Sequence, residues 1–94
     1  MSERDSGRAV WKWPIQFADE FTLSMPVDAT VLTVAMQGGH PCIWALVSVD
    51  APMAVRTFHL YGTGHNVLAG PERYIGTFQT PGAGLVFHLF EVTA

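Results

Sequence analysis

Apolar and polar residues alternate with a period of two along most of the chain, and this pattern predicts strands. The first such segment, Val10–Phe17, places its apolar residues on one face, namely Trp11, Trp13, Ile15 and Phe17. Pro14 lies inside this segment and has no N–H to donate to a sheet. We therefore expect an edge strand here, or a strand with a bulge.

Six further segments carry a strand pattern, and turn-forming residues separate them at roughly regular spacing. They are Phe21–Met25, Thr30–Met36, Pro41–Val49, Val55–Tyr61, Tyr74–Gln79 and Leu85–Val92. No window has a helical period with caps, so the pattern predicts an all-β fold, a small seven-stranded antiparallel sandwich or barrel. A chain of 94 residues fits one domain. We expect a single β domain over residues 9–94 after a flexible N-terminal tail at residues 1–8.

Two adjacent segments, Thr30–Met36 and Pro41–Val49, are apolar on both faces and are joined by the glycine-rich hairpin at residues 37–40. Strands of this kind are buried on both sides. A domain of this size covers one such face well, so a second subunit is the candidate cover for the other. The pattern favours a homodimer or small closed oligomer, and a monomer with one closed core is the alternative.

The number and sign of the charged residues limit the kinds of partner that we expect for this protein. Charged residues make up 14% of the chain, with 5 basic against 8 acidic residues and a net charge of −3. This composition excludes a disordered chain and argues against nucleic-acid binding, which needs clustered Lys and Arg. We also expect no membrane segment, no signal peptide and a cytoplasmic location. The one cysteine, Cys42, lies in an apolar strand and is expected to be a buried, inert thiol.

The sequence Gly62-Thr63-Gly64-His65 follows a predicted strand and offers the clearest candidate for a binding site. Successive backbone N–H groups in such a loop can form an anion-binding nest. Tyr61 and Arg73 would complete a pocket for a small anionic, nucleotide-like ligand. The alternative is a turn whose glycines supply positive φ without any ligand.

The other polar candidates give a weaker signal. The four histidines, at positions 40, 59, 65 and 88, lack metal-site spacing, so no metal and no cofactor is expected. His59 and His88 lie inside strands and would be able to face each other across a sheet. Among the tryptophans we expect Trp44 in the core, whereas Trp11 and Trp13 are either core residues or an exposed interface anchor.

Several longer stretches resemble a family of short proteins from bacteriophages, prophages and bacteria that carries a domain of unknown function. The stretches are Val10–Pro14, Pro41–Val47, Phe58–His65, Tyr74–Gln79 and Leu85–Glu91. The similarity runs from Val10 to Val92. It implies a phage-associated or accessory protein and carries over no catalytic residue.

Together these observations predict a protein that acts by binding and not by catalysis. The first hypothesis is an accessory protein that engages a protein partner, or itself, through an apolar sheet face. The second is a binder or sponge for a small anionic ligand, with pockets in a homo-oligomer. A metal-assisted enzyme is a remote third, because no sequence motif supplies its ligands or its nucleophile.

Overall fold

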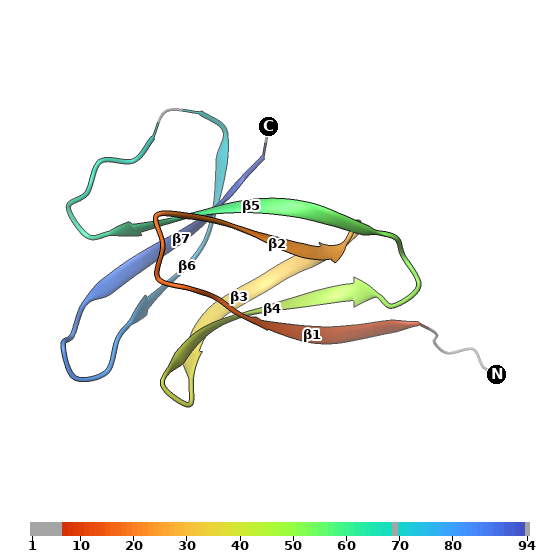
Figure 1. Cartoon of the computed structure of the whole chain (residues 1–94), viewed down its shortest axis with the longest axis horizontal. Helices are drawn as coiled ribbons and strands as arrows, with labels where there is room; N and C mark the ends of the chain where they lie inside the picture. Colours follow the sequence, from red (N-terminus) through yellow and green to blue (C-terminus); the bar gives the residue numbers. More distant parts are fainter. Residues whose placement is uncertain (1–6, 69, 94) are drawn as a thin grey trace.

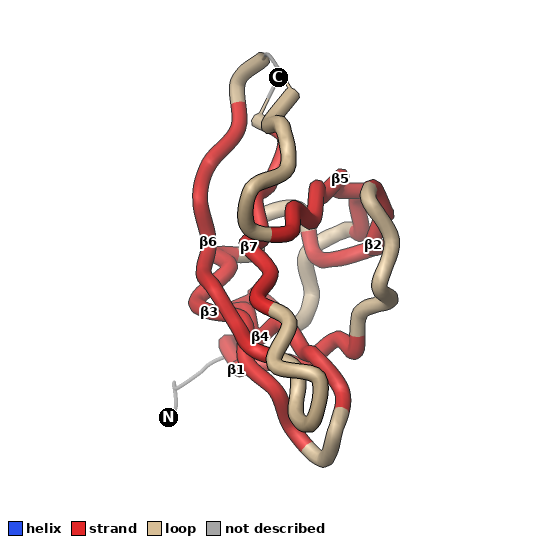
Figure 2. The backbone as a smooth tube through the Cα atoms, turned by 90° about the vertical axis from the view of Figure 1, so that its left-hand side faces the viewer, coloured by secondary structure: helices blue, strands red, loops and turns tan. Residues whose placement is uncertain are grey.

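The computed structural model describes residues 7–68 and 70–93, and within them every regular element is a strand (Figure 1). The strands are β1 (Arg8–Pro14), β2 (Glu20–Pro26), β3 (Thr30–Gln37), β4 (His40–Ser48), β5 (Met53–Gly62), β6 (Glu72–Gln79) and β7 (Val86–Val92). Turns and loops connect them, drawn in tan between the red strands of Figure 2. The predicted all-β class and the seven strand segments are confirmed.

The strands form two sheets, one with the order β1-β4-β3 and one with the order β2-β5-β7-β6. All pairs are antiparallel. The two sheets pack as a sandwich and do not close into a barrel, which decides between the two predicted architectures. The molecule is flat, with principal extents of 50 × 31 × 16 Å.

The core lies between the sheets and is built from alternate residues of each strand. On the central strand β4, Ile43, Ala45 and Val47 are at most 1% exposed. Opposite them lie Phe58 of β5 and Leu89 of β7, both fully buried. Because side chains alternate across a strand, the neighbouring residues point to the outer faces of the sandwich. These outer faces carry the candidate functional surfaces.

A bulge changes which residues of β3 reach the core. The register with β4 shifts between Val31 and Thr33, so Val31 and Val34 both point inward. Leu32, the extra residue, is 49% exposed. The simple alternation expected for this segment was wrong at this point, because a bulge puts two residues opposite one. One apolar side chain is thereby left on the outer face.

Two contacts close the sides of the sandwich. On one side β6 approaches β3 so closely that a Cβ at Gly76 would lie 3.0 Å from Cγ1 of Val34. On the other side the indole Nε1 of Trp13 donates a hydrogen bond of 3.1 Å to the carbonyl oxygen of Ser24 on β2. β1 is an edge strand, as Pro14 predicted.

The first strand is shifted from the predicted Val10–Phe17 to Arg8–Pro14. The difference arises because the chain turns after Ile15, which is still buried, and leaves Phe17 53% exposed. Arg8, the last residue of the expected tail, therefore belongs to β1. Residues 1–6 of that tail lie outside the described residues.

A buried ion pair connects three strands on the inner face of the larger sheet. Arg56 on β5 donates two hydrogen bonds to the carboxylate of Glu91 on β7, at 2.6 and 3.0 Å. Arg56 also donates to the carbonyl oxygen of Ala29 at 2.8 Å, and Arg73 on β6 approaches Glu91 at 3.2 Å. Burial raises the pKa of Glu91, but the two guanidinium groups outweigh it and hold that pKa below its ordinary value. Glu91 is therefore a fixed anion within the framework.

Candidate functional site

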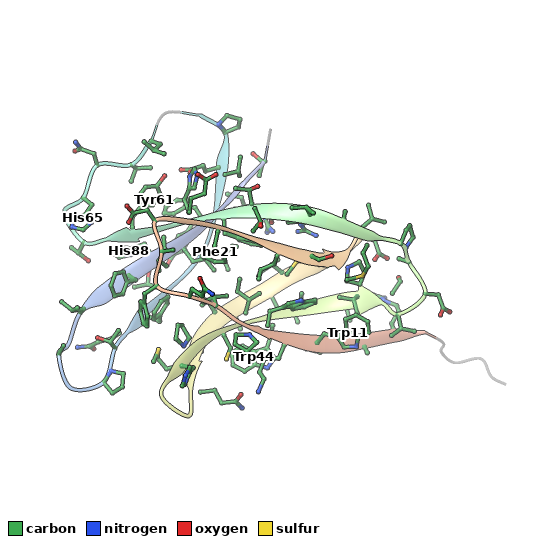
Figure 3. All side chains as sticks on the ribbon, in the orientation of Figure 1. Trp11, Phe21, Trp44, Tyr61, His65 and His88 are labelled. Carbon is green, nitrogen blue, oxygen red and sulfur yellow. The ribbon has the colours of Figure 1, made fainter. Side chains whose placement is uncertain are left out.

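The candidate site lies on the outer face of the larger sheet, beside the loop that connects β5 to β6. Phe58 and Leu60 of β5 point into the core, so His59 and Tyr61 point outward. The register places His88 of β7 opposite Tyr61. Figure 3 shows Tyr61, His65 and His88 together at one end of the molecule, with Trp11 and Trp44 towards the other.

A network of three side chains forms the floor of the site. The hydroxyl of Tyr61 donates to Oε2 of Glu72 at 2.8 Å, and Nδ1 of His59 contacts the same carboxylate oxygen. The backbone N–H of Leu68 donates to the Tyr61 hydroxyl at 3.3 Å, which ties the loop to the sheet. Burial, and next the hydrogen bond to Glu72, raise the pKa of Tyr61. Tyr61 therefore stays a neutral hydroxyl that can donate to Glu72.

His88 fixes the start of the loop. Its Nε2 lies 2.7 Å from the hydroxyl of Thr63 in the loop, and its Nδ1 lies 2.9 Å from the hydroxyl of Thr77 on β6. Both ring nitrogens thus have a hydroxyl partner. The role of His88 in this arrangement is to position the loop on the sheet.

The two glycines of the loop serve different purposes. Gly64 has a φ of +90°, which favours glycine, as the turn interpretation predicted. Gly62 has an ordinary φ, but its missing side chain makes room for the ring of His65. A Cβ at Gly62 would lie 2.9 Å from Cε1 of His65. The pair of glycines therefore positions His65 directly against the strand end.

The structure brings together five of the six residues predicted for a ligand site, namely Tyr61, Gly62, Thr63, Gly64 and His65. Arg73 does not join them, because it is paired in register with Glu91 on the inner face and forms an ion pair with it there. Two N–H groups of the expected nest are already used. Thr63 N–H donates to the carbonyl of Val86, and His65 N–H to the carbonyl of Gly62. These two N–H groups and the Arg73 side chain are therefore engaged elsewhere.

Sequence reasoning missed the acidic residues of this site. Glu20 at the start of β2 has its Oε2 3.8 Å from Nε2 of His59, and Glu72 contacts the other ring nitrogen. The pairing of His59 with His88, which the sequence left open, does not occur, because His59 lies opposite Glu20 and Phe90. The only local signal is the two-residue spacing of His59 and Tyr61, which puts both on one face of a strand.

Of the hollows that His65 lines, two are also lined by Tyr61. The first, here the acidic hollow, has a volume of about 230 Å³ and is lined in part by Asp19, Glu20, His59, Tyr61, His65 and Leu68. The second, here the aromatic hollow, has a volume of about 210 Å³ and is lined in part by Tyr61, Thr63, His65, Val67, Tyr74 and Phe90. Tyr61 and His65 line both hollows. No lysine or arginine of the described residues lines either one.

The tryptophans are arranged differently from expectation. Trp11 and Trp13 point inward and pack against the core, with ring centroids 6.1 Å apart. Of the two alternatives the structure therefore supports the core role for both. Trp44 was expected in the core, but it alternates with the buried Ile43 and Ala45 and so lies on the outer face of β4. Cys42 is buried, as predicted.

Within residues 7–68 and 70–93, no group of three or more His, Cys, Asp or Glu side chains is placed to hold a metal ion. The same part of the chain contains no helix with the length and apolar character required to cross a membrane.

Comparison with known proteins places the whole strand framework in one family. No curated protein and no solved structure matches the chain. A family profile described as a domain of unknown function matches residues 6–94, which include both sheets and the candidate site. The chain therefore belongs to the family of the domain of unknown function DUF7352.

Proposed function

We propose that the protein acts by binding, without catalysis, and that a second copy of the chain packs on the outer face of β1-β4-β3. The observation that carries this proposal is an apolar surface, here the β4 outer face, formed by Val10, Leu32, Trp44 and Leu46. Val10 is 55% and Leu32 49% exposed, and the other two are partly buried. Val10 is paired in register with Leu46, so the surface is continuous across two strands.

The charges around this surface are few. Strands β1, β3 and β4 contain no acidic residue, and their only permanent cations are Arg8 and Lys12 on β1. Lys12 donates to the side-chain oxygen of Gln37 at 2.6 Å. An apolar surface with a polar margin is typical of a protein contact site.

The flat shape supports the choice of a second copy as the occupant. The radius of gyration is 14.5 Å, against about 12 Å for a compact domain of this length. A flat sandwich has two broad faces and a thin core, so pairing through one face adds a further buried layer. Soluble homo-oligomers are most often two-fold dimers, in which the same surface faces itself.

The biological setting that we propose is that of a phage or prophage accessory protein. This part of the proposal is supported by the sequence resemblance alone. The contact surface is proposed independently of it.

The test is the oligomeric state of two matched variants, measured by light scattering after size exclusion at micromolar protein. Leu32→Glu places a charge on the β4 outer face and should convert a dimer of the 10.3 kDa chain to a monomer. Val55→Glu changes an apolar residue that is 73% exposed on the other sheet, and should leave the dimer intact. A wild-type monomer over the whole concentration range would overturn the proposal, as would equal effects of the two variants.

A further inference from the structure

The orientation of His59 suggests the kind of group that fits the acidic hollow. Its Nδ1 contacts Glu72, a carboxylate that accepts hydrogen bonds, so in the neutral ring Nδ1 carries the proton. Its Nε2 is then a lone-pair acceptor, 3.8 Å from Oε2 of Glu20. Two acceptors at this separation can share one donor between them. A ligand N–H group would meet both.

The charges around the same hollow have one sign. Asp19 and Glu20 are exposed at its margin, and the Glu72 carboxylate lies beneath it with its side chain 8% exposed. Among the described residues that line this hollow, His59 and His65 are the ones that can carry a positive charge, and they do so when protonated. A protonated amine therefore fits both the charge and the hydrogen-bonding pattern.

The aromatic hollow, which shares Tyr61 and His65 with the acidic hollow, has a different character. The Phe90 ring lies 5.5 Å from that of Tyr61 and 5.4 Å from that of Tyr74, centroid to centroid, and both pairs are edge-to-face. Val67 adds an aliphatic wall. Such a surface packs against an apolar or aromatic body.

We propose that the two hollows together bind a small organic amine, with its ammonium group between His59 and Glu20 and its apolar body against Tyr74 and Phe90. This site lies on the larger sheet, whereas the proposed dimer surface is on the smaller one. It has the opposite charge preference to the anionic, nucleotide-like ligand expected from the sequence.

The experiment compares probes that differ in one property each. 2-Phenylethylamine carries the ammonium and the ring, phenylacetate keeps the ring with the opposite charge, and methylamine keeps the charge without the ring. Calorimetry gives the affinities, and NMR of the histidine rings locates the binding. We expect 2-phenylethylamine to saturate at millimolar concentration and to shift the resonances of His59 and His65. Phenylacetate should not bind in that range, and methylamine should bind more weakly.

The matched variants are Glu20→Gln and Asp50→Asn. The Glu20 side chain is 64% exposed, so its replacement should not disturb folding, and it should weaken 2-phenylethylamine binding about tenfold. Asp50 lies in the exposed turn between β4 and β5 and should have no effect when replaced. Three results would each overturn the proposal: no saturation by 2-phenylethylamine, phenylacetate binding of equal strength, or unchanged affinity in Glu20→Gln. Each can occur whether or not the chain dimerises, so this test is separate from that of the proposed function.

Discussion

Two glutamates of the larger sheet are buried to the same degree but have opposite surroundings. The side chains of Glu72 on β6 and Glu91 on β7 are 8% and 9% exposed. Glu91 points into the sandwich, where Arg56 and Arg73 supply permanent positive charge. Glu72 lies at the outer face, where its partners are a histidine and a tyrosine.

This difference distinguishes an ion pair whose nitrogens all have partners in the fold from a network in which one ring nitrogen faces a hollow. Arg56 directs Nε and Nη2 at Glu91 and Nη1 at the Ala29 carbonyl, so all three of its nitrogens are engaged. His59, by contrast, uses Nδ1 for Glu72 and presents Nε2 to the acidic hollow. The first network holds strands together, whereas the second leaves one ring nitrogen of His59 facing the acidic hollow.

The largest expected loss of stability comes from removing the guanidinium group of Arg56. Arg56→Met keeps an unbranched apolar stem but removes the guanidinium group, so the half-exposed Arg73 is the one remaining cation beside Glu91. Breaking a buried pair from one side costs about 3–5 kcal/mol of unfolding free energy. Chemical denaturation would measure it. Arg73→Met is the control, with an expected loss below about 1 kcal/mol because the Arg73 side chain is 49% exposed. Similar losses of stability in both variants would contradict the view that the buried Arg56 stabilises Glu91 more than the half-exposed Arg73 does.

A smaller effect should appear as a pH dependence of stability. The pKa of Glu91 is lower in the folded chain than its ordinary value of 4.5, so the unfolded chain binds more protons as the solution becomes acidic. The stabilisation from Glu91 is complete above about pH 5.5. It is lost as the pH falls through 4.5 and then through the folded pKa.

Melting temperatures between pH 7 and pH 3 would test this dependence by comparing the wild type with Glu91→Gln. The variant should begin from a lower melting temperature and lose less on acidification. If the melting temperature of Glu91→Gln fell as steeply with decreasing pH as that of the wild type, other carboxylates would be the cause of the pH dependence.

The smallest expected effect concerns the second network. Tyr61→Phe removes the hydroxyl that joins Glu72 to the backbone of Leu68, at a cost of about 0.5–1.5 kcal/mol. The change should be local, so hydrogen exchange at the Leu68 amide should accelerate while the core strands keep their protection. Tyr74→Phe, which removes a more exposed hydroxyl, should leave Leu68 unchanged. Equal acceleration in both variants would mean that Tyr61 does not hold the loop.

Much of the strand framework was predictable, because the residues that favour a strand are neighbours in the sequence. The pattern of apolar residues predicted all seven strand segments, including two that are apolar on both faces. Pro14 predicted an edge strand or a bulge, because a missing N–H is a property of one residue. The β3 bulge was not predictable in the same way. Whether Leu32 or Thr33 is the extra residue depends on how β3 pairs with β4, and pairing is not a local property.

The same distinction between local properties and strand pairing applies to the candidate site. The sequence predicted that Gly62-Thr63-Gly64-His65 would follow a strand beside Tyr61 and that its glycines would suit a turn, because backbone conformation and strand alternation are local. Only the tertiary structure decided that Arg73 would face Glu91 and that His59 would lie between Glu20 and Glu72. Those contacts join residues 13 to 39 positions apart, through strand pairings that the chain adopts only when its core assembles. That assembly also places Asp19 and Glu20 around a hollow beside His65, where the sequence had suggested a site for an anionic ligand.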